Sequence, residues 1–166
     1  MNDINTIRGI FSGGLPEEMW KAVDALAEKP ALARALVDDL LALLVLARSG
    51  QDAPIRAASA RVLAGLAGDD SVLRDKLYTG LRQKDSPLRR AETAHTIGLM
   101  AGNGPDFGPE LLAQLRLESD STARCRIVEA LGRINFVPAR EAIAKFRNDP
   151  DEALRRAVSD ALKKLS

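Results

Sequence analysis

The stretch Asp85–Leu99, DSPLRRAETAHTIGL, decides the fold of this 166-residue chain. It opens with an Asp-x-x-Leu-Arg frame and continues with apolar residues at helical spacing as far as Gly98. It also contains His95, the single histidine of the sequence. The first question is whether His95 marks a reactive site or whether the stretch is one copy of a structural repeat.

The same frame occurs four times, as DAPIR at Asp52, DSPLR at Asp85, DSTAR at Asp120 and DEALR at Asp151, with spacings of 33, 35 and 31 residues. Shorter amphipathic stretches lie between the frames, so each repeat is predicted to be a pair of helices. The sequence therefore predicts an all-α fold, a right-handed α–α superhelix of about nine helices. We expect residues 1–30 to form an N-terminal helical cap and residues 31–166 to form four helical-hairpin repeats, in a single continuous domain.

These frames resemble a known repeat family. The pattern of Asp, a residue such as Val or Leu, Arg and Ala, followed by Leu-Gly near the end of the second helix, is similar to the HEAT repeat, in the short variant found in phycobilisome-lyase-like proteins. The resemblance covers roughly residues 34–166. Two positions depart from the pattern, because Ala64-Gly65 replaces Leu-Gly and Arg126 stands where the other frames have alanine.

The resemblance implies a ladder in which an Arg of one repeat reaches the turn Asp of a neighbouring repeat and fixes the stacking angle. A guanidinium can hold both oxygens of a carboxylate, which suits this role. The alternative is that the aspartates only cap their helices and the arginines are solvated. The predicted structural ladder consists of Asp52, Arg56, Asp85, Arg89, Asp120, Arg124, Asp151 and Arg155.

The resemblance also implies that the second helix of each pair lines a concave surface. Positions opposite the predicted core face of these helices would then align as a ribbon, which is the predicted partner-binding surface. An ordinary solvated face is the alternative. The predicted partner-binding residues are Arg61, Arg90, Thr93, Cys125, Glu129, Arg156 and Asp160.

His95 is interpreted as a packed, partly buried residue with one hydrogen-bond partner, for which Glu92, one turn earlier, is the candidate. When the frames are aligned, His95 takes the position of Val62, Ala130 and Ala161, on the face predicted to be the core. A catalytic or ligand-binding histidine is the alternative, and whether His95 has a role beyond packing is left open. The loop at residues 101–110, rich in Gly and Pro, is predicted to be a mobile or specificity-bearing insertion, and whether it is functional is left open.

Composition and motifs provide no basis for predicting catalysis. A net charge of +1, one cysteine and one histidine leave neither a nucleophilic triad nor a cysteine–histidine metal site in the sequence. We therefore expect no enzyme activity, no cofactor and no metal. The single cysteine and the absence of a signal-peptide pattern favour the cytoplasm. The most apolar run, at residues 40–47, is shorter than the roughly 20 residues of a spanning helix, so no membrane insertion is expected.

The predicted function is a protein–protein interaction scaffold or adaptor that binds another protein on the concave face. Two alternatives remain open. The resemblance implies an accessory subunit of a chromophore-lyase-type complex. A nucleic-acid-binding role, considered unlikely, would use the C-terminal arginines Arg89, Arg90, Arg124, Arg155 and Arg156.

Overall fold

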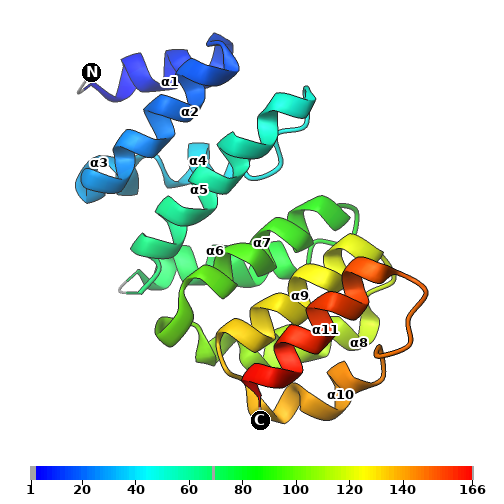
Figure 1. Ribbon diagram of the computed structural model, residues 1–166. Coiled ribbons are helices and arrows are strands. Elements are labelled where there is room, and N and C mark those ends of the chain that lie inside the picture. The colour runs from blue at the N-terminus through cyan, green and yellow to red at the C-terminus, as the bar shows by residue number, and fades with distance from the viewer. Residues whose placement is uncertain (1–2, 69, 166) are drawn as a thin grey trace. The chain divides into compact units, whose positions relative to one another are not determined.

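The computed structural model describes residues 3–68 and 70–165, and every regular element in these ranges is a helix (Figure 1). The predicted all-α fold class is confirmed. The two ranges hold eleven α-helices and five short 3₁₀ helices, where about nine helices were expected. One cause is a break at Leu36, where the backbone turns to φ −113° and ψ 15° and separates two short helices. None of the helices in these ranges has both the length and the apolar character needed to cross a membrane.

The chain divides into two compact units, Met1–Leu73 and Arg74–Ser166, with the boundary inside α6 (Ser71–Leu81). Each unit is described by itself. The expected division into a cap of residues 1–30 and a continuous array of residues 31–166 stays a prediction.

The first unit is built around α5. Helices α2 and α4 pack against it, and Met19, Leu40 and Leu63 are fully buried in this core. Helix α1 begins where the Asp3 carboxylate accepts a hydrogen bond from the backbone N–H of Thr6, at 3.2 Å. The helices of this unit are α1 (Ile4–Gly13), α2 (Pro16–Asp24), η1 (Ala25–Glu28), α3 (Pro30–Ala35), α4 (Val37–Leu43), η2 (Gly50–Asp52) and α5 (Ala53–Leu66).

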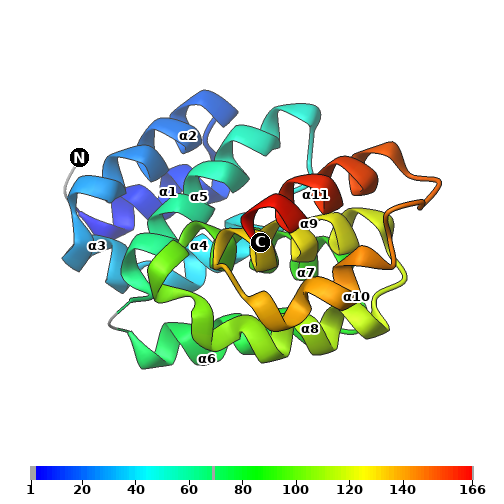
Figure 2. The ribbon, with the colours of Figure 1, turned by 60° about the horizontal axis from the view of Figure 1, so that its bottom comes forward.

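The second unit has two layers of helices. Helices α7, α9 and α11 lie side by side in one layer, and α6, α8 and α10 form the other (Figure 2). This order of stacked hairpins is that of an α-solenoid. After α6, the helices of the unit are α7 (Pro87–Leu99), η3 (Ala101–Asn103), η4 (Pro105–Phe107), α8 (Gly108–Leu117), α9 (Ser121–Arg133), η5 (Val137–Ala139), α10 (Arg140–Ala144) and α11 (Glu152–Lys164).

Side-chain contacts hold the loop at residues 101–110, contrary to the expectation of a mobile segment. Phe107 is fully buried, and the centroid of its ring lies 4.4 Å from that of Tyr78. Arg74 lies over the same ring and donates a hydrogen bond of 2.8 Å to the Asp106 carboxylate. The sequence signals of Gly and Pro located the loop, but they carried no information about these anchoring contacts.

Candidate functional site

The helix N-termini show that the second copy of the repeat frame lies one residue later than its motif suggests. Asp120 and Asp151 cap α9 and α11 with their carboxylates. Helix α7 is capped by the hydroxyl of Ser86, whereas Asp85 is exposed in the turn before it. The cap of α7 is thus one residue beyond the aspartate of the DSPLR motif.

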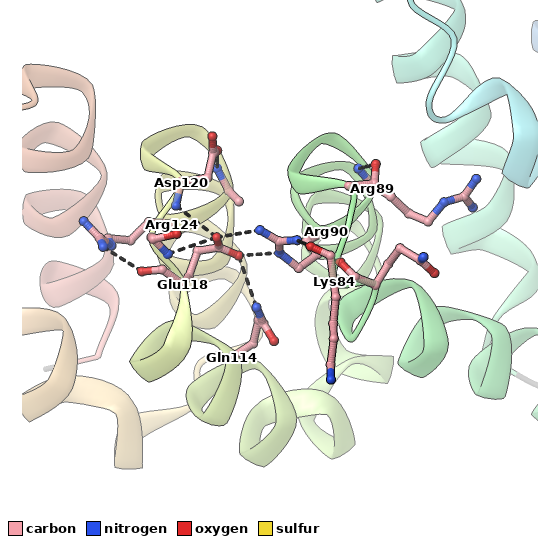
Figure 3. A network of polar contacts seen from close by, with 11 residues as sticks. Lys84, Arg89, Arg90, Gln114, Glu118, Asp120 and Arg124 are labelled. Atoms are coloured by element: carbon pink, nitrogen blue, oxygen red, sulfur yellow. Dashed lines mark hydrogen bonds and ion pairs between the residues drawn. The ribbon is translucent and has the colours of Figure 1, made fainter.

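Counted from the cap, the frame arginine of α7 is Arg90 rather than Arg89. Its Nη1 donates to the carbonyl oxygens of Gln83 and Lys84, at 2.8 and 2.9 Å. Each of the other frame arginines likewise donates to a carbonyl oxygen before its own helix. The side chain of Arg89 points away from Glu118, which binds Arg90 (Figure 3). The equivalent side chains are therefore those of Arg56, Arg90, Arg124 and Arg155.

A buried ion pair joins α7 to the loop between α8 and α9. Arg90 donates from Nε and Nη2 to the two oxygens of Glu118, at 2.6 and 2.8 Å (Figure 3). The side chains of Arg90 and Glu118 are 9% and 1% exposed. Glu118 also accepts hydrogen bonds from Gln114 Nε2 and from the backbone N–H groups of Ser119 and Asp120. The carboxylate thus has five donors in a site closed to water.

These donors determine the protonation of Glu118. Burial by itself would raise the pKa of this carboxyl group. The hydrogen bonds from Arg90, the Asp120 N–H and Gln114, together with the charge of Arg90, outweigh burial and lower the pKa to about 2. Glu118 is therefore ionised at any physiological pH.

A second rung of the ladder follows between α9 and the loop before α11. Arg124 donates from Nη2 to the carbonyl oxygen of Glu118 at 2.6 Å, and its Nη1 lies 3.8 Å from Oδ2 of Asp149. The same guanidinium lies over the Phe146 ring, 5.0 Å from its centroid. The acceptors in both rungs stand two residues before a helix cap.

The frame aspartates, which were expected to accept these arginines, make other contacts. Asp120 and Asp151 accept hydrogen bonds from the N–H groups of their own helices, and Asp151 also accepts one from the Ser121 hydroxyl. Asp52 is buried, and its Oδ2 accepts a hydrogen bond of 2.6 Å from the Ser49 N–H. Because capping occupies Asp120 and Asp151, Arg90 instead binds Glu118, and Arg124 lies 3.8 Å from Asp149 as an ion pair.

A groove of about 330 Å³ lies between α9 and α11. The close approach of Gly132 to α11 forms part of it, since a Cβ atom on Gly132 would lie 2.8 Å from Cα of Ala161. Arg133 and Lys164 also line the groove. The predicted partner-binding residues that the structure brings together here are Cys125, Glu129, Arg156 and Asp160.

The charged groups of this groove have neighbours of opposite sign on their own helices. Glu129 accepts a hydrogen bond of 3.0 Å from Arg126, and Arg156 donates to Glu152. Asp160 lies 3.4 Å from Lys163 Nζ. The groove therefore presents both signs of charge, in two exposed pairs on α11 and a half-buried pair on α9. Exposed pairs exchange partners at low cost.

Cys125 offers a weak polar contact rather than a nucleophile. Its Sγ lies 3.8 Å from Glu129 Oε1 and 3.8 Å from the carbonyl oxygen of Ala153. Burial, followed by the negative charge of Glu129, raises the pKa of the thiol to about 11. The thiol is thus protonated at neutral pH, where the thiolate would be the reactive form.

The other three predicted partner-binding residues lie elsewhere. Arg61 is exposed on α5 in the first unit and lies 3.1 Å from Asp24 Oδ1. Arg90 is 8% exposed and Thr93 is 2% exposed, so neither is available as a contact surface. For Arg90 the error arose because the frame of α7 begins one residue later than predicted. Thr93 was wrong for a different reason, since Ala60 and Val128, which are aligned with it in the predicted register, are buried as well.

The one-residue shift of the repeat frame in α7 also changes which residues of the other repeats are equivalent to His95. Thr96, fully buried, takes the core position of α7, and its hydroxyl donates to the carbonyl oxygen of Glu92. His95 is half-buried, and its Nδ1 makes no hydrogen bond within the described residues. Burial, then the charges of Arg126 and Arg133, lower the pKa of His95 to about 4. Its true equivalents are the ribbon residues Arg61, Glu129 and Asp160.

The hairpins and their ladder define an all-α solenoid of the HEAT-like class. No family model matches the sequence, and no curated protein matches it. Among solved structures, the chain is similar to the complex of CpcE and CpcF of phycocyanin lyase from Nostoc sp. PCC7120, with a TM-score of 0.59 and 20% identity. The match covers 100% of this chain and 66% of that chain, and it shows a shared HEAT-like fold.

Proposed function

We propose that this chain is a non-enzymatic scaffold or adaptor of the cytoplasm that binds another protein in the groove between α9 and α11. The observation that carries the proposal is the convergence of Cys125, Glu129, Arg156 and Asp160 on one groove. The match to a complex of two proteins supports a protein as the partner.

The chemistry of the groove favours a polypeptide over a reacting substrate. Its thiol is held protonated, and its acids are paired with bases on the same helix, so no side chain is poised for proton transfer or nucleophilic attack. Exposed ion pairs contribute little to folding, which leaves them free to pair with charges of a partner.

The test uses a charge exchange that preserves net charge. Arg156→Glu with Asp160→Arg reverses the pattern on α11, where both side chains are exposed. Glu141→Lys with Lys145→Glu does the same on α10, in the other layer of helices, and serves as the control.

The tagged chain and both variants are used to capture proteins from native extract of the source cells, followed by quantitative mass spectrometry. We expect the α11 variant to lose the captured partner and the α10 variant to retain it, with equal melting temperatures. Capture of the same partner by all three forms would exclude the groove as the binding site.

A second candidate function, an accessory subunit of a lyase-type complex, is supported by the match to a phycocyanin lyase complex. In this case the raised pKa of Cys125 argues against covalent capture of a chromophore by that thiol. An absorbance titration with a free bilin tests the candidate. A spectral change that persists in Cys125→Ser would support non-covalent binding, and no change would exclude this candidate.

The third possibility, nucleic-acid binding through the C-terminal arginines, has weaker support. Arg90 and Arg124 donate to groups inside the second unit, and Arg156 donates to Glu152. These contacts reduce the number of guanidinium groups available to phosphates. Fluorescence anisotropy with duplex DNA at low salt tests it directly.

A further inference from the structure

Helix α11 carries a third arginine of the ladder, Arg155, at the position equivalent to Arg90 and Arg124. Arg155 donates from Nη1 to the carbonyl oxygens of Asp149 and Pro150, at 2.7 and 2.9 Å. Arg90 makes a comparable pair of contacts with its own Nη1, to carbonyl oxygens seven and six residues before it where those of Arg155 are six and five residues before. In both arginines the two contacts hold the plane of the guanidinium. In Arg90 this arrangement presents Nε and Nη2 to Glu118.

The corresponding edge of Arg155 has no such acceptor. Within residues 3–68 and 70–165, the hydrogen bonds of its side chain are those to the two carbonyl oxygens. Asp151 is affected by the charge of Arg155, but its oxygens accept hydrogen bonds from the Ser121 hydroxyl and the Leu154 N–H. The Nε and Nη2 groups of Arg155 therefore form an exposed, pre-oriented fork of the kind that binds a carboxylate.

The surface around this fork is basic and partly apolar. It is a groove of about 580 Å³ whose lining includes Arg140, Arg147, Arg155 and Lys163 and, among the described residues, no acidic side chain. Leu162 lines it too and is partly exposed. The residues at the equivalent position of the other repeats are fully buried, namely Leu63, Ile97 and Leu131.

The groove differs in one respect from the surfaces that join the hairpins inside the unit. Between those hairpins, Gly98 and Gly132 allow the next helix to approach closely. A Cβ atom on Gly98 would lie 3.1 Å from Cα of Ala130, and one on Gly132 would lie 2.8 Å from Cα of Ala161. Lys163 stands at the equivalent position of α11 and prevents such an approach. An occupant must therefore be less closely packed, and it must offer negative charge to Arg140, Arg147 and Arg155, since Lys163 already lies 3.4 Å from Asp160 Oδ1.

We propose that this face of α10 and α11 binds an acidic segment of a partner protein. One carboxylate of the segment takes on Arg155 the place that Glu118 takes on Arg90, and an adjacent apolar side chain covers Leu162. The surface is distinct from the groove between α9 and α11, and the proposal does not depend on it.

The test uses the chain's own acceptor as the probe. The peptide consists of residues 108–120, in which Glu118 follows the sequence of α8. It is titrated into the full ¹⁵N-labelled chain, and the Nε–Hε resonance of Arg155 is followed by NMR. A matched peptide carries Glu118→Gln. We expect the Arg155 resonance to shift with the first peptide and the Gln peptide to bind about tenfold more weakly, because a charge-assisted fork is lost.

Two protein variants localise the effect. Arg155→Gln is expected to weaken the peptide about tenfold. Arg156→Gln, which removes the neighbouring arginine from the other groove, is expected to leave peptide affinity unchanged. Because Arg155 is exposed, the Arg155→Gln chain should still fold despite losing the two hydrogen bonds to the loop, and circular dichroism checks this.

The proposal is overturned if neither peptide binds, if the two peptides bind equally, or if Arg155→Gln leaves affinity unchanged. It is also overturned if duplex DNA shifts the Arg155 resonance and the acidic peptide does not, since the face would then be a phosphate site. A loss of partner capture in Arg156→Gln, with unchanged peptide affinity, separates the two surfaces.

Discussion

Replacing Glu118 with Gln tests whether the buried ion pair stabilises the second unit. In the folded chain the pKa of Glu118 is about 2, against an ordinary value of 4.5. Each pH unit of this difference corresponds to about 1.4 kcal/mol, so ionisation of Glu118 contributes about 3 kcal/mol to the free energy of unfolding at neutral pH. We expect Glu118→Gln to lose about this amount, because it leaves the Arg90 charge buried without a counter-charge.

The free energy that Glu118 contributes to unfolding should decrease as the pH falls. A carboxyl group whose folded pKa is lowered contributes its full stability above the unfolded value of 4.5, and the contribution is lost as the pH falls towards 2. In urea unfolding followed by circular dichroism, the difference between the wild type and Glu118→Gln should be constant from pH 7 to pH 5. It should then shrink between pH 4.5 and pH 2, as Glu118 of the wild type becomes neutral.

An exposed pair of the same type provides the control. Arg82 donates from Nε and Nη2 to Glu110 at 2.7 and 2.9 Å, in a site open to solvent. Glu110→Gln should lose much less stability than Glu118→Gln, because water screens this pair. Equal losses for the two variants, or a Glu118→Gln difference that does not decrease below pH 4.5, would refute the assignment of the stability to the buried carboxylate.

Three further predictions test the helix register and packing. Ser86→Ala should lower the free energy of unfolding by about 1 kcal/mol, and Asp85→Ala should leave it almost unchanged, because the serine caps α7. A larger loss for Asp85→Ala would show that Asp85 is the cap, as the motif predicts. Gly132→Ala should destabilise by about 1–3 kcal/mol because its Cβ would overlap α11, whereas Gly65→Ala, with open space around it, should stabilise by up to about 1 kcal/mol. His95→Val should keep or raise the melting temperature at pH 7 and reduce the loss of stability between pH 6.5 and pH 4, where a histidine with a lowered pKa opposes folding; unchanged acid sensitivity would contradict this.

The sequence was a good guide to the helices and a poorer guide to individual side chains. The four frames located the starts of the second helices, because capping and helical periodicity are local properties. The error at α7 arose because Asp85 matches the motif better than Ser86, although both residues are suitable caps. The spacing of Gly98 and Gly132, each eight residues after the true frame arginine, was the signal that would have corrected it.

The acceptors of the ladder had no comparable signal. Glu118 and Asp149 differ in type and lie in loops, where an acidic residue is ordinarily solvent-exposed. Their role depends on donors 25–28 residues away in the sequence, as with Arg90 and Arg124. These ion pairs form only when one hairpin packs against the next, so the sequence of a single repeat does not indicate them. Four of the seven predicted partner-binding residues line one groove because they recur at the same positions of α9 and α11.

The hydrogen bonds to Glu118 also couple solvent exchange in its loop to the packing of α7, on the preceding hairpin. The amides of Ser119 and Asp120 donate to a carboxylate that Arg90, on the preceding hairpin, holds in place. Opening of α7 would release that carboxylate to water and expose both amides to solvent exchange. Amide hydrogen exchange at these two residues therefore measures how often adjacent hairpins separate, without any label at the surface where they meet.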